Sequence, residues 1–215
     1  MQRLLIFASG TVEGGGFGFK KLVENARVGT LQAEIVGVVS NHEHGGVRQK
    51  VDTLDIPFVF FQGPWTAEEY QRIVRENRAD YVALSGWLKI VPGLDPRRTI
   101  NIHPGPLPQF GGAGLYGHRV HEAVFAAYRG GKIKHSAVSM HFVTKEYDRG
   151  PVFFEYPVEI RADHTAETLA ARVNAIEHEW QSRITDMVVR GDISWDGKDP
   201  ASLKVPEGYE FLPKP

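Results

Sequence analysis

The stretch RLLIFAS, residues 3–9, is closed by Gly10 and sets how the chain begins to fold. A continuous apolar run of this length is typical of a parallel strand that is covered on both faces. The segment from Gly10 to Gly18 then contains five glycines, and residues 19–26 carry apolar side chains at helical spacing. A buried strand, a glycine-rich connection and an amphipathic helix together indicate the first half of a β-α-β unit.

The same alternation continues through the next 60 residues or so. Strands and helices are expected in turn, at residues 33–40, 47–54, 56–61, 66–79 and 80–87. Thr66 and Glu69 should form a capping box at the start of one of these helices. Strands that alternate with helices predict an α/β fold with a doubly wound sheet. Ligands of such sheets bind outside the carboxyl ends of the strands, so the following loops should carry the polar groups of a site.

The second half of the chain changes pattern. A helix is expected over residues 117–131, and another over 165–191, where Thr165 and Thr168 lie near its start. Between them, residues 137–143 and 150–160 should pair as antiparallel strands because their connection is short. We therefore predict a Rossmann-like, mostly parallel sheet with an antiparallel edge in the C-terminal half.

The division of the chain follows from the same pattern. Residues 1–191 are expected to form one domain, and residues 192–215, with four prolines and little periodicity, an extended C-terminal tail.

Composition narrows the classes of function. The 215 residues include 25 basic and 26 acidic side chains, which argues against a nucleic-acid binder that relies on a broad basic field. There is no cysteine, so disulfides and cysteine-ligated metals are excluded. No apolar stretch approaches the roughly 20 residues of a membrane helix, and the first apolar run is too short for a signal peptide. A cytoplasmic protein with no membrane or nucleic-acid partner is the expectation.

The segment TINIHPGPLPQF, residues 99–110, ends a β-branched run in two polar residues. Three alternating prolines stop the strand at His103 because they fix φ and remove backbone donors. Asn101 and His103 are two positions apart and should point to one face, where an amide can bind a developing oxyanion and an imidazole can exchange a proton. Taken alone, a histidine bonded by loop carbonyls explains the pattern equally well.

Other polar motifs support narrower hypotheses. Asp148, in a turn, either bonds its own backbone or, if the turn folds over His103, raises the pKa of that imidazole. The glycine-rich loop favours phosphate binding modestly over a mobile surface loop, although it matches neither G-x-G-x-x-G nor a P-loop. The local histidine pairs 42/44 and 118/121 lack matching carboxylates, so we expect no metal site. No G-x-S-x-G elbow is present to support a serine hydrolase.

Two stretches resemble the folate-dependent formyltransferases. NIHPGPLPQFGG and SAVSMHFVTKEYDRGPV follow the family pattern of Asn-x-His-Pro at a strand end, then Leu-Pro, and later His-Phe-Val leading to Asp-x-Gly-Pro. GGAGLYGHRVHEAV resembles a family variant with an insertion after Leu-Pro, LSGWLKIV matches the pteridine-pocket segment, and ARVNAIEHEW resembles a substrate-contacting helix. The likeness covers roughly residues 3–190 and is greatest to members that formylate phosphoribosylglycinamide in purine synthesis.

The resemblance implies direct formyl transfer from 10-formyltetrahydrofolate to a primary amine, without a metal or a covalent enzyme intermediate. Asn101 and protonated His103 would stabilise the oxyanion, while Asp148 would favour the imidazolium and assist proton transfer. The resemblance assigns folate binding to Trp87, Leu88, Lys89, Ile90, Val91, Asn101, His141, Val143, Thr144, Tyr147 and Asp148. It assigns binding of the amine substrate to Gly10, Gly15, Gly16, Phe17, Gly18, Pro104, Asn174 and Glu177.

Departures from the family leave the acceptor open. The first loop is longer than usual and places Phe17, Gly18 and Phe19 where polar residues are expected, with Lys20 or Lys21 as a replacement contact. Another amine, such as a nucleotide-linked amino sugar, is an alternative acceptor, and a non-catalytic folate-binding protein is an alternative function. A tRNA substrate is disfavoured because only about two dozen residues follow Arg190 and the chain is not basic. The sequence leaves the oligomeric state open, with a homodimer among the alternatives.

Overall fold

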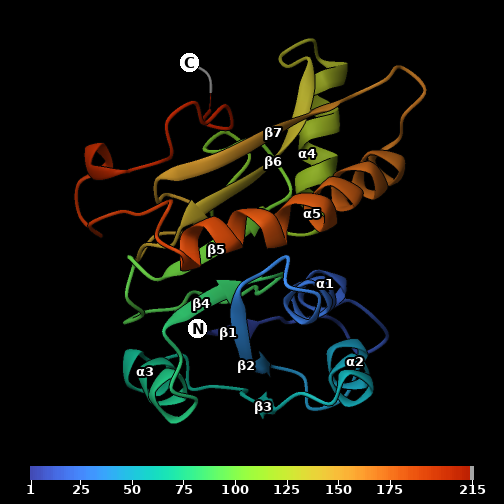
Figure 1. The fold of residues 1–215 in the computed structure, drawn as a ribbon. Helices are drawn as coiled ribbons and strands as arrows, with labels where there is room; N and C mark the ends of the chain where they lie inside the picture. Colours follow the sequence, from blue (N-terminus) through green and yellow to red (C-terminus); the bar gives the residue numbers. More distant parts are fainter. Residues whose placement is uncertain (214–215) are drawn as a thin grey trace.

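The computed structural model describes residues 1–213, which contain one seven-stranded sheet flanked by helices (Figure 1). The strands lie in the order β3-β2-β1-β4-β5-β6-β7. Their bounds are Gln2–Phe7 for β1, Ala33–Ser40 for β2, Phe58–Phe60 for β3, Tyr81–Leu84 for β4, Thr99–His103 for β5, His135–Phe142 for β6 and Val152–Glu159 for β7. The first five are parallel, whereas β6 is antiparallel to both β5 and β7. The predicted sheet with an antiparallel C-terminal edge is confirmed.

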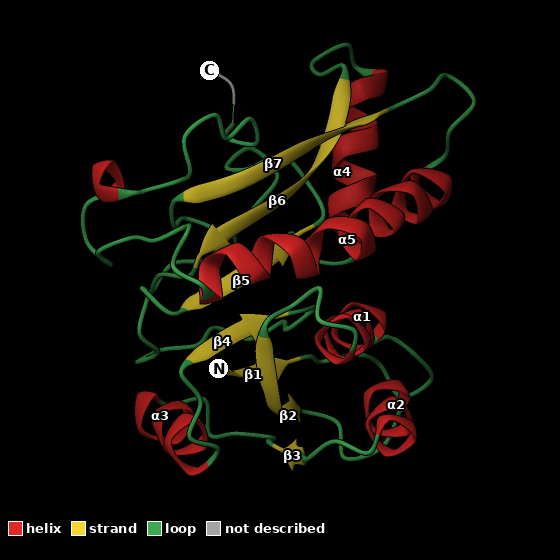
Figure 2. Ribbon diagram, viewed as in Figure 1, coloured by secondary structure: helices red, strands yellow, loops and turns green. Residues whose placement is uncertain are grey.

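Helices cover both faces of this sheet (Figure 2). Their bounds are Phe17–Arg27 for α1, Gly46–Leu54 for α2, Ala67–Glu76 for α3, His118–Arg129 for α4 and Ala166–Val189 for α5, with a 3₁₀ turn at Pro200–Ser202. One hydrophobic cluster joins the sheet to α1, α2, α4 and α5, and a second joins its other face to Tyr70 and Ile73 of α3. The sheet is therefore doubly wound. No helix within residues 1–213 is long and apolar enough to span a membrane.

The strand order creates the crevice in which a ligand can bind. Strand β1 lies between β2 and β4, so the chain leaves β1 in one direction and returns on its other side. The carboxyl ends of β1 and β4 then open toward loops that diverge, as at the switch point of other doubly wound sheets. The loop from Gly10 follows β1, Ser85 follows β4, and β5 ends beside them at His103.

Only half of the predicted capping box at α3 forms. The Thr66 hydroxyl accepts a hydrogen bond from the Glu69 backbone N–H at 3.4 Å. The Glu69 carboxylate pairs instead with Arg72, one turn along the same helix, at 2.8 Å. At the start of α5, by contrast, Thr165 and Thr168 bond each other's backbone in both directions.

The tail packs against the last strand and the long helix. Glu155 of β7 donates its backbone N–H to the Phe211 carbonyl at 2.7 Å. The Phe211 ring lies 4.8 Å from Trp180 of α5 and 5.4 Å from Phe154 of β7, centroid to centroid. This contact covers part of the edge strand, which would otherwise offer unpaired backbone groups. The division into 1–191 and 192–215 stays a prediction, and Lys214 and Pro215 lie outside the described residues.

Truncating Phe211 should destabilise the fold because its ring fills a cluster of aromatic side chains. We expect Phe211→Ala to lower the free energy of unfolding by about 2 kcal/mol, below the cost of a fully buried phenylalanine because the ring is half-buried. Denaturant unfolding of this variant and of Leu212→Ala, at an exposed neighbouring position, measures the effect. Equal losses from the two variants would show that the tail is not docked as described.

Candidate active site

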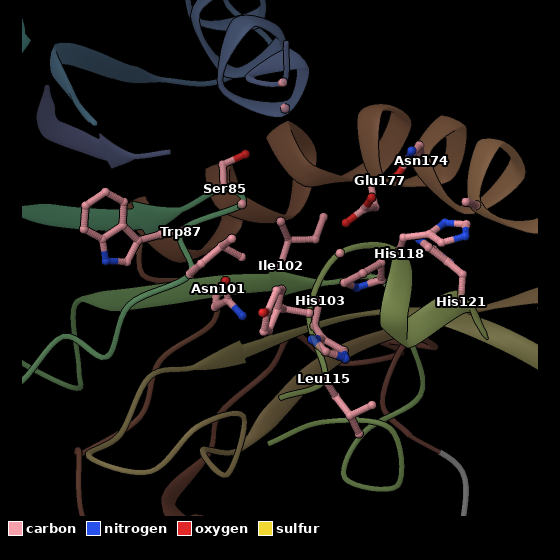
Figure 3. A pocket seen from close by; sticks show the side chains of 18 of the residues that line it. Ser85, Trp87, Asn101, Ile102, His103, Leu115, His118, His121, Asn174 and Glu177 are labelled. Atoms are coloured by element: carbon pink, nitrogen blue, oxygen red, sulfur yellow. The ribbon is translucent and has the colours of Figure 1, made fainter. Parts of the chain in front are cut away.

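A cavity of about 640 Å³ opens at the carboxyl ends of β1, β4 and β5 (Figure 3). Its volume is in the range of sites for small molecules. It is lined by residues of the glycine-rich loop, of the segment after β4, of the end of β5, of the loop and first turn of α4, of the β6–β7 turn and of α5. Six segments that are distant in the sequence thus meet around one space.

The end of β5 divides its side chains between core and cavity. Ile100 and Ile102 belong to the larger hydrophobic cluster, and Ile102 also lines the cavity. Asn101 and His103 point to the opposite face of the strand, as the strand period predicts. In the antiparallel pairing with β6, Asn101 is opposite His141 and His103 is opposite Ser139. The β6 strand therefore places a second imidazole next to the Asn-x-His pair.

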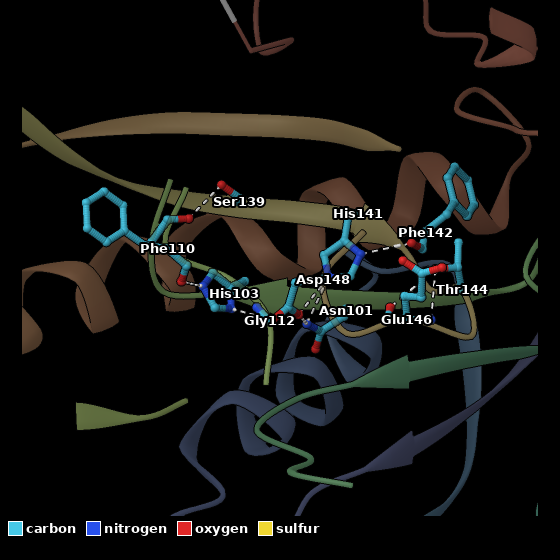
Figure 4. Close-up of polar contacts among 11 residues, drawn as sticks. Asn101, His103, Phe110, Gly112, Ser139, His141, Phe142, Thr144, Glu146 and Asp148 are labelled. Atoms are coloured by element: carbon cyan, nitrogen blue, oxygen red, sulfur yellow. Dashed lines mark hydrogen bonds and ion pairs between the residues drawn. The ribbon is translucent and has the colours of Figure 1, made fainter. Parts of the chain in front are cut away.

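Asp148 turns inward and closes this polar cluster (Figure 4). Its Oδ2 accepts the Gly112 backbone N–H at 2.9 Å and lies 3.8 Å from His103 Nδ1. Its Oδ1 lies 3.4 Å from His141 Nε2 and 3.5 Å from Asn101 Nδ2. Asp148 adopts a left-handed conformation, with φ of 53°, a region that aspartate tolerates better than most residues. Of the two alternatives for Asp148, bonding of its own backbone and folding over His103, the structure shows the second.

Hydrogen bonds to carbonyl groups fix where the two rings carry their protons. His103 Nε2 lies 2.8 Å from the Phe110 carbonyl oxygen, and His141 Nδ1 lies 2.8 Å from that of Phe142. A carbonyl oxygen only accepts, so both of these nitrogens donate. In the neutral rings, His103 Nδ1 and His141 Nε2 are therefore the free lone pairs.

This assignment also fixes the orientation of Asn101. Its Nδ2 lies 3.1 Å from His141 Nε2, which can accept a hydrogen bond only if the amide nitrogen faces it. The Asn101 donors are thus directed at His141 and Asp148, and the carbonyl oxygen is left for the cavity. The resting side chain offers an acceptor to the cavity, and donation from Asn101 to a developing oxyanion, which the sequence led us to expect, stays a prediction.

Burial controls the charge on the catalytic candidates. It lowers the pKa of His103, and the Asp148 carboxylate and the Phe110 carbonyl oppose this shift without offsetting it. The resting imidazole is therefore neutral at neutral pH, and the protonated ring that the resemblance implies for the tetrahedral intermediate stays a prediction. Burial alone would raise the pKa of Asp148, but a hydrogen bond from His141 and the positive charge of His103, both made when these rings are protonated, and the Gly112 N–H hold that pKa below its ordinary value. A carboxylate beside a neutral imidazole can stabilise the imidazolium once a proton arrives.

Helix α5 supplies the polar groups of the opposite wall. Asn174 and Glu177, three positions apart, share a face and line the cavity with His178. Burial raises the pKa of Glu177 to about 7. Its carboxyl group is ready to lose its proton when a ligand donates hydrogen bonds to it.

The glycine-rich loop forms the third wall. All five of its predicted contacts, Gly10, Gly15, Gly16, Phe17 and Gly18, line the cavity. Gly16 precedes α1 without a side-chain cap, which leaves the first backbone N–H groups of this helix available to an anion. Lys20 and Lys21, the suggested replacement contacts, lie outside the cavity lining, and both pair with Glu24 of α1.

The residues predicted to bind folate divide into two groups. Trp87, Leu88 and Tyr147 line the cavity together with Asn101 and Asp148. The others lie outside its lining. Val91 and Val143 pack in the hydrophobic cluster that includes α3, Lys89 lies over the Trp65 ring, and Ile90 is exposed. Thr144 forms a hydrogen bond within its own turn, and His141 contacts Asn101. Contact of this second group with folate stays a prediction.

Several contacts escaped the sequence analysis. Two backbone groups bind the catalytic candidates directly: the Phe110 carbonyl accepts from His103, and the Gly112 N–H donates to Asp148. In addition, the Ser139 hydroxyl donates to the Gly105 carbonyl at 2.8 Å. Backbone groups leave no trace in residue type, so only the strand register could have identified Ser139. Pro104 lies on the cavity wall, and its contact with the amine substrate stays a prediction. Within residues 1–213, no group of three or more His, Asp or Glu side chains gathers to hold a metal.

Comparison with known proteins identifies the family to which the chain belongs. The profile of a family described as formyl transferase matches residues 2–185. The chain belongs to the formyl transferase family. The chloroplastic phosphoribosylglycinamide formyltransferase of Arabidopsis thaliana is 32% identical over 205 residues, which cover 90% of this chain and 68% of that protein.

Other similar proteins carry the names of two different activities. The crystal structure of phosphoribosylglycinamide formyltransferase from Bacillus halodurans has a TM-score of 0.75 and 26% identity, with 88% of this chain and 96% of that chain covered. The formyltetrahydrofolate deformylase of Escherichia coli is 30% identical over 171 residues, 75% of this chain and 57% of that protein. Family membership alone therefore leaves two reactions to be distinguished.

A methyl group at Gly111 should displace the Asp148 carboxylate. The added Cβ would lie 2.4 Å from Leu107 Cδ2 and 2.8 Å from Asp148 Cβ. We expect Gly111→Ala to lower kcat of the formyl transferase by about 100-fold, the scale of a 1 Å misplacement at a reacting centre. Gly130→Ala, where the added Cβ has contacts of 3.5 Å or more, is the matched control. Equal kcat values in steady-state assays of the two variants would contradict the placement of Asp148.

The raised pKa of Glu177 should appear in the pH dependence of stability. The unfolded carboxyl ionises near 4.5 and the folded one near 7, so the folded state retains a proton that the unfolded state has lost between these values. The stabilisation is therefore present below pH 4.5 and is lost as pH rises to 7, at about 1.4 kcal/mol per pH unit. Denaturant unfolding should show the wild type losing stability relative to Glu177→Gln over this window, with a constant difference above it. A difference that does not vary with pH would place Glu177 in water.

Proposed function

We propose that this formyl transferase moves the formyl group of 10-formyltetrahydrofolate to the primary amine of phosphoribosylglycinamide. The carrying observation is that Asp148, His103 and Asn101 converge at the rim of a cavity whose other walls suit a phosphorylated ribosyl amine. The Arabidopsis and Bacillus relatives carry the name of this activity.

The resting protonation states support a base-first mechanism. The amine nitrogen attacks the formyl carbon, which gives a tetrahedral intermediate with a negative oxygen and a positive nitrogen. The Asn101 carbonyl oxygen accepts a hydrogen bond from the amine and aligns it. The free lone pair of His103 Nδ1 takes the proton from that nitrogen, and the Asp148 carboxylate stabilises the resulting imidazolium.

The same proton completes the transfer. The imidazolium stabilises the oxyanion, an effect worth roughly 3 kcal/mol for a well-placed donor. It then donates its proton to N10 of the folate as the carbon–N10 bond breaks, which releases tetrahydrofolate and the formylated amide. Every proton that the amine loses is thus returned to the leaving nitrogen, and no metal takes part.

The remaining walls divide between the two substrates. Trp87, Leu88 and Tyr147 offer apolar surface for the folate rings on one side of the reacting centre. The glycine-rich loop suits the phosphate of the acceptor, and Asn174 and Glu177 suit its ribose hydroxyls. Use of Gly10, Gly15, Gly16, Phe17, Gly18 and Pro104 for the acceptor stays within this proposal.

An assay of 10-formyltetrahydrofolate with and without candidate amines tests the proposal. Formyl transfer to phosphoribosylglycinamide should be fast, and His103→Ala should abolish it, by at least about 100-fold. Amino-sugar nucleotides should be poor acceptors. Release of formate at the same rate without any amine would identify a deformylase, the activity named in the Escherichia coli relative, and would overturn the proposal.

Cellular location and assembly are part of the same proposal. We place the protein in the cytoplasm, although the similar plant proteins are named as chloroplastic. We also include a homodimer, which light scattering of the purified chain distinguishes from a monomer.

A further inference from the structure

One buried imidazole on the cavity wall has no task in this mechanism. His121 lies in the first turns of α4, lines the cavity and is only 3% exposed. Its Nδ1 is buried and has no hydrogen-bond partner among residues 1–213. Buried polar atoms without partners are rare in folded proteins, so an orphaned ring nitrogen beside a ligand cavity calls for a functional explanation.

We propose that His121 donates a hydrogen bond from Nε2 to an uncharged oxygen of the acceptor substrate and so contributes to the choice of acceptor. The oxygen is a ribose hydroxyl or the amide carbonyl. This inference rests on the proposed function, since it assigns part of the same cavity to the amine substrate.

The burial of Nδ1 selects the tautomer. A proton on Nδ1 would leave a buried N–H donor without an acceptor, which is less well tolerated than a bare lone pair. The proton of the neutral ring therefore belongs on Nε2. Since Nδ1 is buried, Nε2 is the ring nitrogen of His121 that can donate a hydrogen bond to a ligand in the cavity.

The position of α4 selects the acceptor half of the site. His118, one turn before His121, pairs with Glu167 of α5 at 3.5 Å, so this end of α4 lies against the helix that carries Asn174 and Glu177. Figure 3 shows both histidines on the side of the cavity remote from Trp87, where the folate rings are placed. A group on this wall is directed at the amine substrate.

The charge of the ring selects an uncharged oxygen. Burial, together with the neighbouring His118 and His103, lowers the pKa of His121 to about 4. The ring is therefore a neutral donor throughout the range in which the enzyme works. The phosphate is left to the glycine-rich loop, where the first backbone N–H groups of α1 are uncapped.

A purely structural role predicts different surroundings. The apolar contacts of α4 with the core are made by Val120 and Val124, which belong to the larger hydrophobic cluster. A histidine that served only to pack would be replaceable by an apolar side chain without an effect on substrate affinity. This difference separates the two explanations by experiment.

Steady-state kinetics of His121→Leu, His121→Phe and His121→Gln test the proposal. The two apolar variants should raise KM for phosphoribosylglycinamide by about tenfold, the scale of one lost hydrogen bond, with kcat and the KM for 10-formyltetrahydrofolate within about twofold of the wild type. The glutamine variant, whose amide N–H can take the place of Nε2–H, should restore most of the affinity. Arg129→Gln, at an exposed position of α4, is the control. Two apolar variants are used so that the test can still be made if one of them does not fold.

Acceptor analogues identify the oxygen. If a ribose hydroxyl is the partner, the KM values of wild type and His121→Leu should be equal for the analogue that lacks this hydroxyl, either the 2-deoxyribosyl or the 3-deoxyribosyl compound. If the amide carbonyl is the partner, the tenfold difference in KM between the two proteins should remain with both analogues. An unchanged acceptor KM in the apolar variants, a raised donor KM instead, or no rescue by glutamine would overturn the proposal. Wild-type turnover of phosphoribosylglycinamide tests the proposed function separately. If another amine proves to be the acceptor, the same KM ratios are measured with that amine.

Discussion

The carboxylate of Asp148 is the constraint on which the rest of the site depends. It is bound by a backbone N–H from the loop before α4 and faces side chains from β5 and β6, so one charged group ties its own turn to three other segments. A partly buried carboxylate is stable only if such partners replace its water. The same partners make it useful, because a fixed negative charge beside a neutral imidazole favours the protonated ring at the moment of proton transfer.

The fold provides this arrangement through two different devices. The parallel half of the sheet brings loops with diverging directions to one edge, which opens the cavity and leaves the glycine-rich loop beside it. The antiparallel edge then adds what a parallel sheet alone would not. Because β6 runs against β5, His141 is registered opposite Asn101, and the turn after β6 returns Asp148 over the end of β5.

Much of this could be predicted from sequence, for physical reasons. Apolar runs and helical periodicity depend on burial, so strands such as β2 and the antiparallel β6–β7 pair were located closely. The period of a strand placed Asn101 and His103 on one face. The protonation state of His103 could not be predicted, since it depends on burial by distant segments as well as on the nearest charge. The Glu69 half of the predicted capping box at α3 is missing for a similar reason, because Arg72 competes for the Glu69 carboxylate.

If Asp148 acts electrostatically on His103, the pKa of the His103 ring depends on this carboxylate, and NMR titration of the ring measures that dependence. In Asp148→Asn, the carboxylate that opposes the burial effect is gone, while a side chain of similar size remains. We expect the pKa of His103 to fall further below its wild-type value in this variant. A pKa that is unchanged or higher would show that the two groups are not coupled, and the proposed proton transfer would have to be abandoned.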